Sequence, residues 1–189
     1  MAENYTLVGI SGSLRRASYS TAILLTLAEA VADRATTVVA DIGSLPHYNA
    51  DLDTDTPPDE VQRLKDQIAR ADGLIVVSAE FNHGIPGVLK NAIDWASRPV
   101  FKSPLRDKPV LIVTESPAFT GGVRAQYQLR EAFASALARP VPTPEIVIGT
   151  VQNKVAGGRL TDRAAIDFAA AAIATLFHEI DQLHLAATA

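Results

Sequence analysis

Residues 9–20, GISGSLRRASYS, decide the fold prediction because they join an apolar run to a helical pattern through one short polar loop. The apolar run before the loop, residues 5–10, suits a buried strand. After the loop, Ile23, Leu27 and Val31 recur at helical spacing and give the next segment one apolar face. A strand, a loop and an amphipathic helix in this order form the repeating unit of a parallel sheet covered by helices.

The same unit recurs along the chain. Further strands are predicted at residues 36–41, 73–79, 109–115 and 144–149, which makes five strands in all. Two helices are expected after Pro86 and after the glycines at 121 and 122, and apolar helical faces occur at Val61, Leu64 and Ile68 and at Ile166, Ile173, Phe177 and Ile180. Right-handed crossovers leave few topologies, and the order 2-1-3-4-5 is the commonest for this size. The predicted fold class is therefore α/β, a flavodoxin-like three-layer sandwich with helices on both faces of a parallel sheet.

Composition excludes several classes of protein. The 189 residues are 48% hydrophobic, enough for one domain, and a net charge of −4 with 17 scattered Lys and Arg argues against a nucleic-acid partner. The chain has no cysteine, so redox chemistry needs a cofactor, and this composition fits a reducing compartment. Residues 1–8 carry no basic leader and the run AAAAIATLF is too short to span a bilayer, which predicts a cytoplasmic protein with no membrane partner.

Three loops at the predicted carboxyl ends of strands are unusual in composition, and in this topology they surround one switch point. The loop within residues 9–20 combines hydroxyls and guanidiniums with the free N–H groups of a helix N-terminus, which together favour a phosphate group. Its polar residues are Ser11, Ser13, Arg15, Arg16, Ser18 and Ser20. A plainer interpretation is that Ser18 or Ser20 only caps the helix. Neither G-x-x-x-x-G-K-[ST] nor G-x-G-x-x-G occurs, which disfavours nucleoside triphosphatases and Rossmann dinucleotide binders.

The second loop follows the third predicted strand and places Glu80, Phe81, Asn82 and His83 in a row. An aromatic ring, an amide and exposed backbone at a strand end suit a flat heteroaromatic ligand. The plainer interpretation makes Asn82 and His83 turn residues and Phe81 a core residue, and for Phe81 taken alone it is the preferred one. In the third loop, residues 116–127, two glycines let the backbone approach a ligand closely. All three loops are expected to converge on one ligand.

These segments resemble the NADPH-dependent FMN reductase family. The stretches GSLRRASYS, EFNHGIPGVLKNAIDW and FTGGVRAQY occur in the order and spacing of that family, and PEIVIGTVQNKV is similar to its quinone and chromate reductase branch. The resemblance implies that residues 1–189 form a single flavodoxin-like FMN-binding domain of a homodimer or homotetramer. It also implies an enzyme that passes a hydride from NADPH, or NADH, through FMN to a small acceptor such as a quinone, free flavin, an azo compound or chromate.

The resemblance further implies a set of cofactor-binding residues, and no residue is assigned as a catalytic acid or base. The residues that would hold the phosphate and ribityl end are Ser11, Ser13, Leu14, Arg15, Ser18 and Ser20. Those that would border the isoalloxazine are Glu80, Phe81, Asn82 and His83 from one loop and Ser116, Pro117, Thr120 and Gly121 from the other. The chain departs from the family pattern at Ala79, Phe81 and Ser20, where proline, tyrosine and asparagine are usual. Loss of the rigid proline and the tyrosine hydroxyl is expected to change the tightness of FMN binding.

Two other functions share parts of this pattern. A flavodoxin-like electron carrier or an FMN-binding regulatory protein would have the same fold and phosphate loop, and direct reduction of the flavin by NADPH separates an enzyme from both. A serine hydrolase is the enzymatic rival because GISGS nearly matches the G-x-S-x-G elbow, but Ser13 replaces the last glycine. The hydrolase would also need a histidine near the loop, whereas His178 and His184 fall on the last predicted helix.

Metal sites have little support in the sequence, and an interface site has somewhat more. Residues 51–62 begin like a calcium loop, yet Thr56 and Gln62 stand where glycine and glutamate are required, so a solvated acidic loop is predicted. The four histidines show no metal-ligand spacing. By resemblance, an oligomer contact is expected at Arg124, Tyr127 and Glu145, and the alternative there is a weak surface salt bridge.

Overall fold

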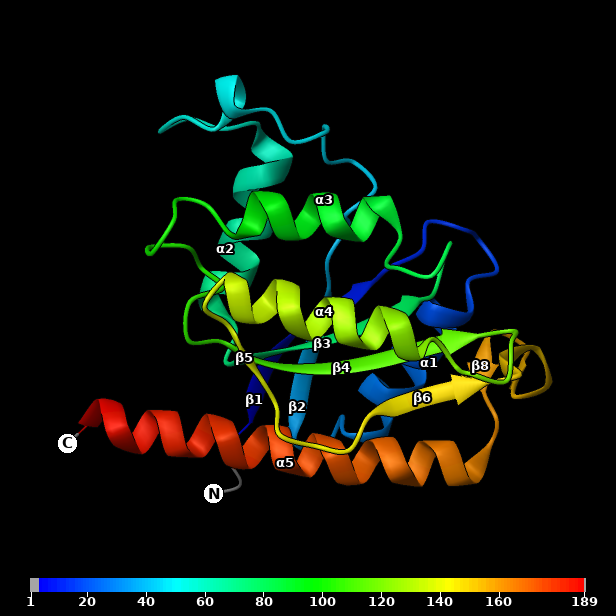
Figure 1. The fold of residues 1–189 in the computed structure, drawn as a ribbon. Helices are drawn as coiled ribbons and strands as arrows, with labels where there is room; N and C mark the ends of the chain where they lie inside the picture. Colours follow the sequence, from blue (N-terminus) through cyan, green and yellow to red (C-terminus); the bar gives the residue numbers. More distant parts are fainter. Residues whose placement is uncertain (1–3, 189) are drawn as a thin grey trace.

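A computed structural model describes residues 4–188. Residues 1–3 and 189, which belong to the predicted 1–189 domain and include the start of the N-terminus predicted to carry no leader, lie outside the described residues. Strands and α-helices alternate along the chain from β1 to α4, and four short strands then precede the last helix (Figure 1). The helices are α1 Tyr19–Ala30, α2 Asp59–Arg70, α3 Gly87–Ala96, α4 Val123–Ser135 and α5 Arg163–Thr188, with short 3₁₀ turns at Ala50–Leu52 and Val151–Asn153. The strands are β1 Tyr5–Ser11, β2 Ala35–Val39, β3 Gly73–Ala79, β4 Pro109–Ser116, β5 Arg139–Pro140, β6 Ile146–Gly149, β7 Val155–Ala156 and β8 Arg159–Leu160.

The main sheet is parallel and has the order β2-β1-β3-β4, with both β5 and β6 paired to β4. This confirms the predicted order 2-1-3-4-5, and the strand predicted at residues 144–149 is β6. The predicted count of five strands was wrong, because the two-residue β5 also pairs with β4. The fifth position is split because Pro140, Pro142 and Pro144 lack the N–H groups that a strand ladder needs. The main sheet therefore has six strands, and β7 and β8 form a separate antiparallel pair.

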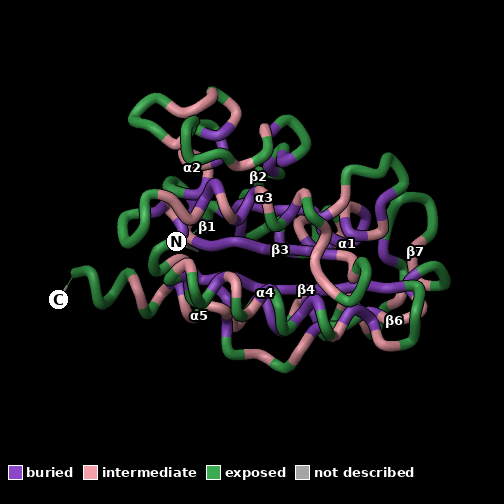
Figure 2. The backbone as a smooth tube through the Cα atoms, turned by 45° about the horizontal axis from the view of Figure 1, so that its top comes forward, coloured by how far each residue is buried: buried purple, intermediate pink, exposed green. Residues whose placement is uncertain are grey.

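Helices cover both faces of the main sheet. In Figure 1, α3 and α4 lie on one face and α5 on the other, and the buried side chains group α2 with the first pair and α1 with α5. The central strands are buried along nearly their whole length (Figure 2). Burial on both faces explains why β3 and β4 read as continuous apolar runs instead of alternating ones.

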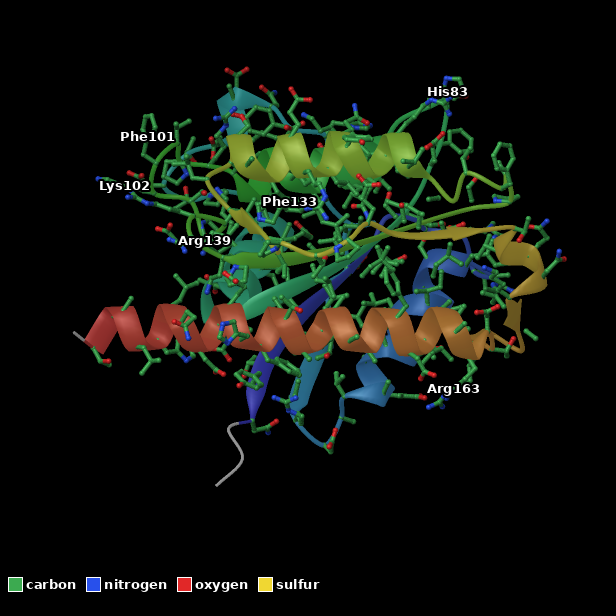
Figure 3. The ribbon with its side chains drawn as sticks, turned by 60° about the horizontal axis from the view of Figure 1, so that its bottom comes forward. His83, Phe101, Lys102, Phe133, Arg139 and Arg163 are labelled. Atoms are coloured by element: carbon green, nitrogen blue, oxygen red, sulfur yellow. The ribbon has the colours of Figure 1, made fainter. Side chains whose placement is uncertain are left out.

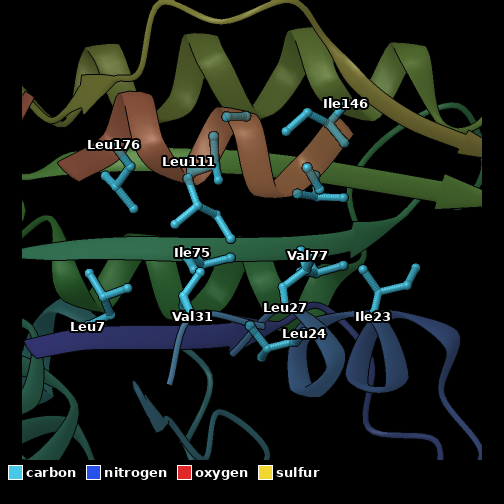
Figure 4. Close-up of a cluster of buried hydrophobic side chains, with 14 of the residues drawn as sticks. Leu7, Ile23, Leu24, Leu27, Val31, Ile75, Val77, Leu111, Ile146 and Leu176 are labelled. Carbon is cyan, nitrogen blue, oxygen red and sulfur yellow. The ribbon is translucent and has the colours of Figure 1, made fainter. Parts of the chain in front are cut away.

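Each face of the sheet has its own core cluster. Figure 4 shows the cluster that α1 and α5 cover, which includes Ile23 and Leu27 from α1 and Ile75 and Val77 from β3. The opposite cluster holds Trp95 and Phe133, which are fully buried. The predicted helical faces are buried as expected, at Val31, Val61, Leu64, Ile68, Ile173, Phe177 and Ile180, and Ile166 is half-buried.

Helix α3 also fastens the loop that follows β2. The Asn91 side chain accepts a hydrogen bond from the Tyr48 N–H (2.7 Å) and donates one to the Pro46 carbonyl (2.9 Å). The Trp95 indole N–H donates to the same carbonyl at 2.8 Å. Because both side chains come from the segment GVLKNAIDW, the later part of the second predicted ligand loop, residues 79–95, has a structural role.

Replacing Asn91 with alanine is expected to lower the free energy of unfolding by about 2 kcal/mol, because the Tyr48 N–H then loses its acceptor and the Pro46 carbonyl one of its two donors. Urea unfolding followed by tryptophan fluorescence measures the change. Lys90→Ala is the control on the same helix, since it breaks only the partly exposed pair with Asp94 and should cost about 0.5 kcal/mol. Equal losses in the two variants would contradict the proposed fastening.

Candidate functional site

The three predicted loops meet at the carboxyl edge of the sheet. The Gly12 N–H donates to the Val77 carbonyl at 2.8 Å, and the Glu80 N–H donates to the Glu115 carbonyl at 3.1 Å. The Ser20 hydroxyl donates to Glu115 Oε1 at 2.8 Å, which links the first loop to the end of β4. Figure 3 shows His83 at this end of the molecule, opposite Phe101, Lys102 and Arg139. The predicted convergence of the loops is therefore present in the fold.

The loop between β1 and α1 has the geometry of an anion site. Ser18 is the N-cap of α1, and its hydroxyl accepts from the Thr21 N–H at 3.1 Å, which confirms its predicted capping role. Within residues 4–188, the N–H groups of Ser13, Leu14 and Arg16 have no protein acceptor. Free N–H donors beside two arginines, at the positive end of a helix, suit a phosphate group.

Hydroxyl groups line the same loop. The Ser11 and Thr21 hydroxyls are hydrogen-bonded to each other at 2.8 Å, and the Ser13 hydroxyl accepts from the Arg15 N–H at 3.4 Å. The Arg15 guanidinium lies 4.9 Å from the centre of the Tyr19 ring. The sequence-based prediction missed Thr21, although a hydroxyl three residues after the N-cap is a usable signal. Leu14 points into solvent, with 60% of its surface exposed.

Glu115 is a second residue that the sequence-based prediction missed. It lies at the end of β4, only 3% exposed, and its Oε2 has no hydrogen-bond partner among the described residues. Burial raises the pKa of the carboxyl, while the hydroxyl and N–H of Ser20 and the charge of Arg15 act in the opposite direction. The sequence feature that could have pointed to Glu115 is that it is a single acidic residue within the apolar run PVLIVTES.

The loop after β3 is a tight hairpin turn. Phe81 and Gly84 exchange N–H···O bonds of 2.8 and 3.0 Å across Asn82 and His83, whose φ angles are +50° and +63°. These angles are those of a two-residue type I′ turn. The predicted turn roles of Asn82 and His83 are confirmed. The prediction that Phe81 is a core residue was wrong: it is 69% exposed, because the turn projects past the part of β3 that helices cover.

Glu80 holds the second and third loops together. Its Oε2 accepts from the N–H groups of Arg124 (2.9 Å) and Ala125 (3.4 Å), at the first turn of α4. The N-cap of α4 is Gly122, which has no side chain, so Glu80 supplies the capping oxygen from the loop after β3. The Arg124 guanidinium also pairs with Glu80 at 3.5 Å, a salt bridge with a partner that the sequence-based prediction did not name.

The loop between β4 and α4 lies on the end of β6. The Ser116 hydroxyl accepts from the Ala118 N–H at 3.1 Å, and the Ala118 carbonyl accepts from the Thr150 N–H at 3.1 Å. Gly121 has a φ of +63°, which turns the chain back into the helix. Of the other predicted site residues here, Pro117 is exposed and Thr120 half-buried.

The residues of the rival hydrolase and metal sites have structural roles. The Ser11 hydroxyl pairs with Thr21, and His178 and His184 lie on α5 as predicted. In the acidic loop, Asp53 pairs with Lys65 at 3.4 Å. Among residues 4–188, no group of three or more His, Cys, Asp or Glu side chains is placed to hold a metal ion. No helix in that part of the chain is both long and apolar enough to cross a membrane.

Comparison with known proteins identifies the family. The model of the NADPH-dependent FMN reductase family matches residues 5–153. The chain belongs to this family. An NAD(P)H-dependent FMN reductase of Pseudomonas aeruginosa is 40% identical over 166 residues, which cover 87% of this chain and 89% of that protein. A quinone reductase of Escherichia coli is 39% identical over 171 residues, 88% of this chain and 90% of that protein.

A solved structure supports the same assignment to the FMN reductase family. The flavoenzyme NAD(P)H:(acceptor) oxidoreductase FerB of Paracoccus denitrificans superposes with a TM-score of 0.80 at 30% identity, over 94% of this chain and 98% of that one. Family membership confirms the predicted class: an oxidoreductase with a flavodoxin-like fold that uses FMN as cofactor and NAD(P)H as donor.

Proposed function

We propose that this FMN reductase family member is a quinone reductase, formed by residues 1–189 as a single domain, which passes hydride equivalents from NADPH to a small quinone. The observation that carries the proposal is the set of free N–H donors beside Arg15 and Arg16 at the N-terminus of α1, which suits the phosphate of FMN. Relatives that are named quinone reductases and cover most of the chain support the choice of acceptor.

The proposed cofactor residues divide into two groups. The phosphate and ribityl end is assigned to the β1–α1 loop, where Ser13, Arg15 and Ser18 offer charge and hydroxyls and the missed Thr21 adds a hydroxyl. The isoalloxazine end is assigned to residues 80–83 together with Ser116, Pro117, Thr120 and Gly121. Bound FMN supplies a ring that accepts a hydride from the nicotinamide. This chain contributes orientation of the ring and local electrostatics, with exposed N–H groups near Asn82 and His83 placed to tune it.

We also propose a cytoplasmic homodimer or homotetramer without a nucleic-acid partner. Aromatic side chains exposed near the carboxyl edge support self-association, because Phe81, Phe119 and Tyr127 are 69%, 87% and 64% exposed. Arg124 and Glu145 are the polar residues assigned to the same contact. Light scattering at several protein concentrations tests the proposal, and a monomer throughout would refute it.

The decisive experiment is an anaerobic absorbance titration of the FMN-loaded protein with NADPH, followed by addition of a benzoquinone. We expect NADPH to bleach the oxidised flavin band and the quinone to restore it. If FMN binds but NADPH leaves the band unchanged, the protein is an electron carrier or regulatory protein instead. If NADPH bleaches the band and only free flavin, an azo dye or chromate restores it, the protein is an NADPH-dependent enzyme whose acceptor is not a quinone. Repeating the titration with NADH gives the donor preference.

A further inference from the structure

The carboxyl of Glu115 lies where the proposed phosphate site begins. It comes from the end of β4, accepts from the Ser20 hydroxyl in the first turn of α1, and lies within electrostatic reach of Arg15. Both Glu115 and Ser20 are more than nine-tenths buried, so water does not satisfy the carboxyl. Its Oε2 has no partner among the described residues, which leaves one buried oxygen unpaired on a carboxyl whose Oε1 contacts the first turn of α1.

A carboxylate at this place competes with a phosphate. Both anions are attracted to the N-terminal end of α1 and to the positive charge of Arg15, and like charges held close together repel each other. Protonation of Glu115 removes the repulsion and turns one of its oxygens into a donor. The protonation state of the Glu115 carboxyl is therefore expected to affect how tightly the phosphate group binds.

We propose that Glu115 is a proton-linked gate for the phosphate of FMN: the ionised carboxyl holds the phosphate off, and FMN binds as the carboxyl takes up one proton from solvent. The inference rests on the proposed function, since it takes the β1–α1 loop as the phosphate site. Glu115 is a positioning residue in this account, not a catalytic one.

The charged groups around Glu115 are few. Arg15 faces it from the β1–α1 loop, and α1 presents only the uncharged Ser20. Glu80, in the loop after β3, donates its backbone N–H to the Glu115 carbonyl, while the Glu80 carboxylate accepts from the Arg124 N–H at the start of α4. On the far side of β4, β6 pairs Ile148 with Glu115 and brings no charge. Arg15 is therefore the charge that opposes ionised Glu115 and would bind phosphate as well.

The sign of the pH effect follows from linkage. Because burial raises the pKa of Glu115, the cofactor-free protein binds more protons than its unfolded chain between the unfolded and folded pKa values. The contribution of Glu115 to the free energy of unfolding of the cofactor-free protein is fully present below the pKa that this carboxyl has in the unfolded chain. That contribution is lost as the pH rises through the pKa of Glu115 in the folded protein. FMN binding takes up a further proton at high pH, so the dissociation constant is expected to rise about tenfold per pH unit there.

The test measures FMN binding by quenching of flavin fluorescence between pH 7 and 9, where the phosphate stays doubly ionised because its second pKa is about 6. We expect FMN binding to the wild type to weaken as the pH rises, by at most about tenfold per pH unit, and Glu115→Gln to bind FMN more tightly than the wild type at pH 9 with a flat profile. Riboflavin, which lacks the phosphate, should bind both proteins equally. Glu131→Gln removes one exposed carboxylate on α4 and should keep the wild-type profile.

Several outcomes overturn the gate. If FMN binds normally and Glu115→Gln keeps the wild-type pH profile, the gate is wrong while the cofactor site stands. If the wild type binds no FMN at any pH from 6 to 9, the cofactor site and the gate fail together. Should the variant not fold, calorimetry on the wild type in two buffers of different ionisation enthalpy decides. Proton uptake that rises toward one with increasing pH between 6 and 9 supports the gate, and uptake of none throughout that range refutes it.

Discussion

Replacing Gly121 with alanine is expected to lower the free energy of unfolding by about 3 kcal/mol. About 1–2 kcal/mol of this comes from placing a β-carbon at a φ of +63°, a conformation that L-residues avoid. The remainder comes from overpacking, because the new Cβ would lie 2.8 Å from the Gly149 nitrogen and 2.9 Å from the Ile148 nitrogen. These neighbours are backbone atoms of β6, so no side-chain rotation relieves the contact. Urea unfolding of the cofactor-free protein measures the loss.

Gly157 provides a matched control for this experiment. Its φ is +57°, close to that of Gly121, but nothing lies within 4 Å of a Cβ built there. Gly157→Ala should therefore cost only about 1–2 kcal/mol, and the difference between the variants isolates the steric contact with β6. Equal losses of stability in the two variants would show that the β4–α4 loop moves away from β6 without cost, which would contradict the expected steric contact. In the proposed site, Gly121→Ala should also weaken FMN binding, whereas Gly157→Ala should not.

Much of the fold could be predicted because burial leaves a direct trace in sequence. Strands covered on both faces become unbroken apolar runs, and β3 was predicted with its observed bounds, residues 73–79. The fifth strand could not be predicted so well, since a ladder interrupted by Pro140, Pro142 and Pro144 depends on which N–H groups face β4. The short β7–β8 pair also went unpredicted, because two-residue strands leave no periodicity to detect.

The candidate site was predicted less evenly than the fold. Convergence of the three loops followed from topology, because carboxyl ends of neighbouring parallel strands share one edge. Individual side chains depended on tertiary geometry: Glu80 was assigned to the ring pocket, yet its carboxylate caps α4, and exposed Phe81 was expected in the core. The Glu115–Ser20 contact joins residues 95 positions apart, and a single sequence gives no signal for such a pair.

Replacing Arg15 with alanine is expected to raise the dissociation constant of FMN by about 10- to 100-fold at pH 7, the loss of about 1.5–3 kcal/mol for a hydrogen bond to a charged group. Arg15 is placed for this role by its position in the loop, 4.9 Å from the Tyr19 ring at the first residue of α1. The same variant should lose most of the salt dependence of FMN binding, because screening acts on exposed charge pairs. Fluorescence titration at two ionic strengths measures both effects.

Arg16→Ala is the matched control, since it removes the same charge from the neighbouring exposed position. A general loss of positive potential would weaken FMN binding equally in both variants, whereas a directed contact makes Arg15→Ala the weaker binder. Riboflavin separates the phosphate from the ring: its binding should be unchanged in Arg15→Ala, because the guanidinium is assigned to the phosphate end. An equal loss of riboflavin affinity in Arg15→Ala would indicate that Arg15 contacts the ring. The phosphate would then have to bind elsewhere in the β1–α1 loop.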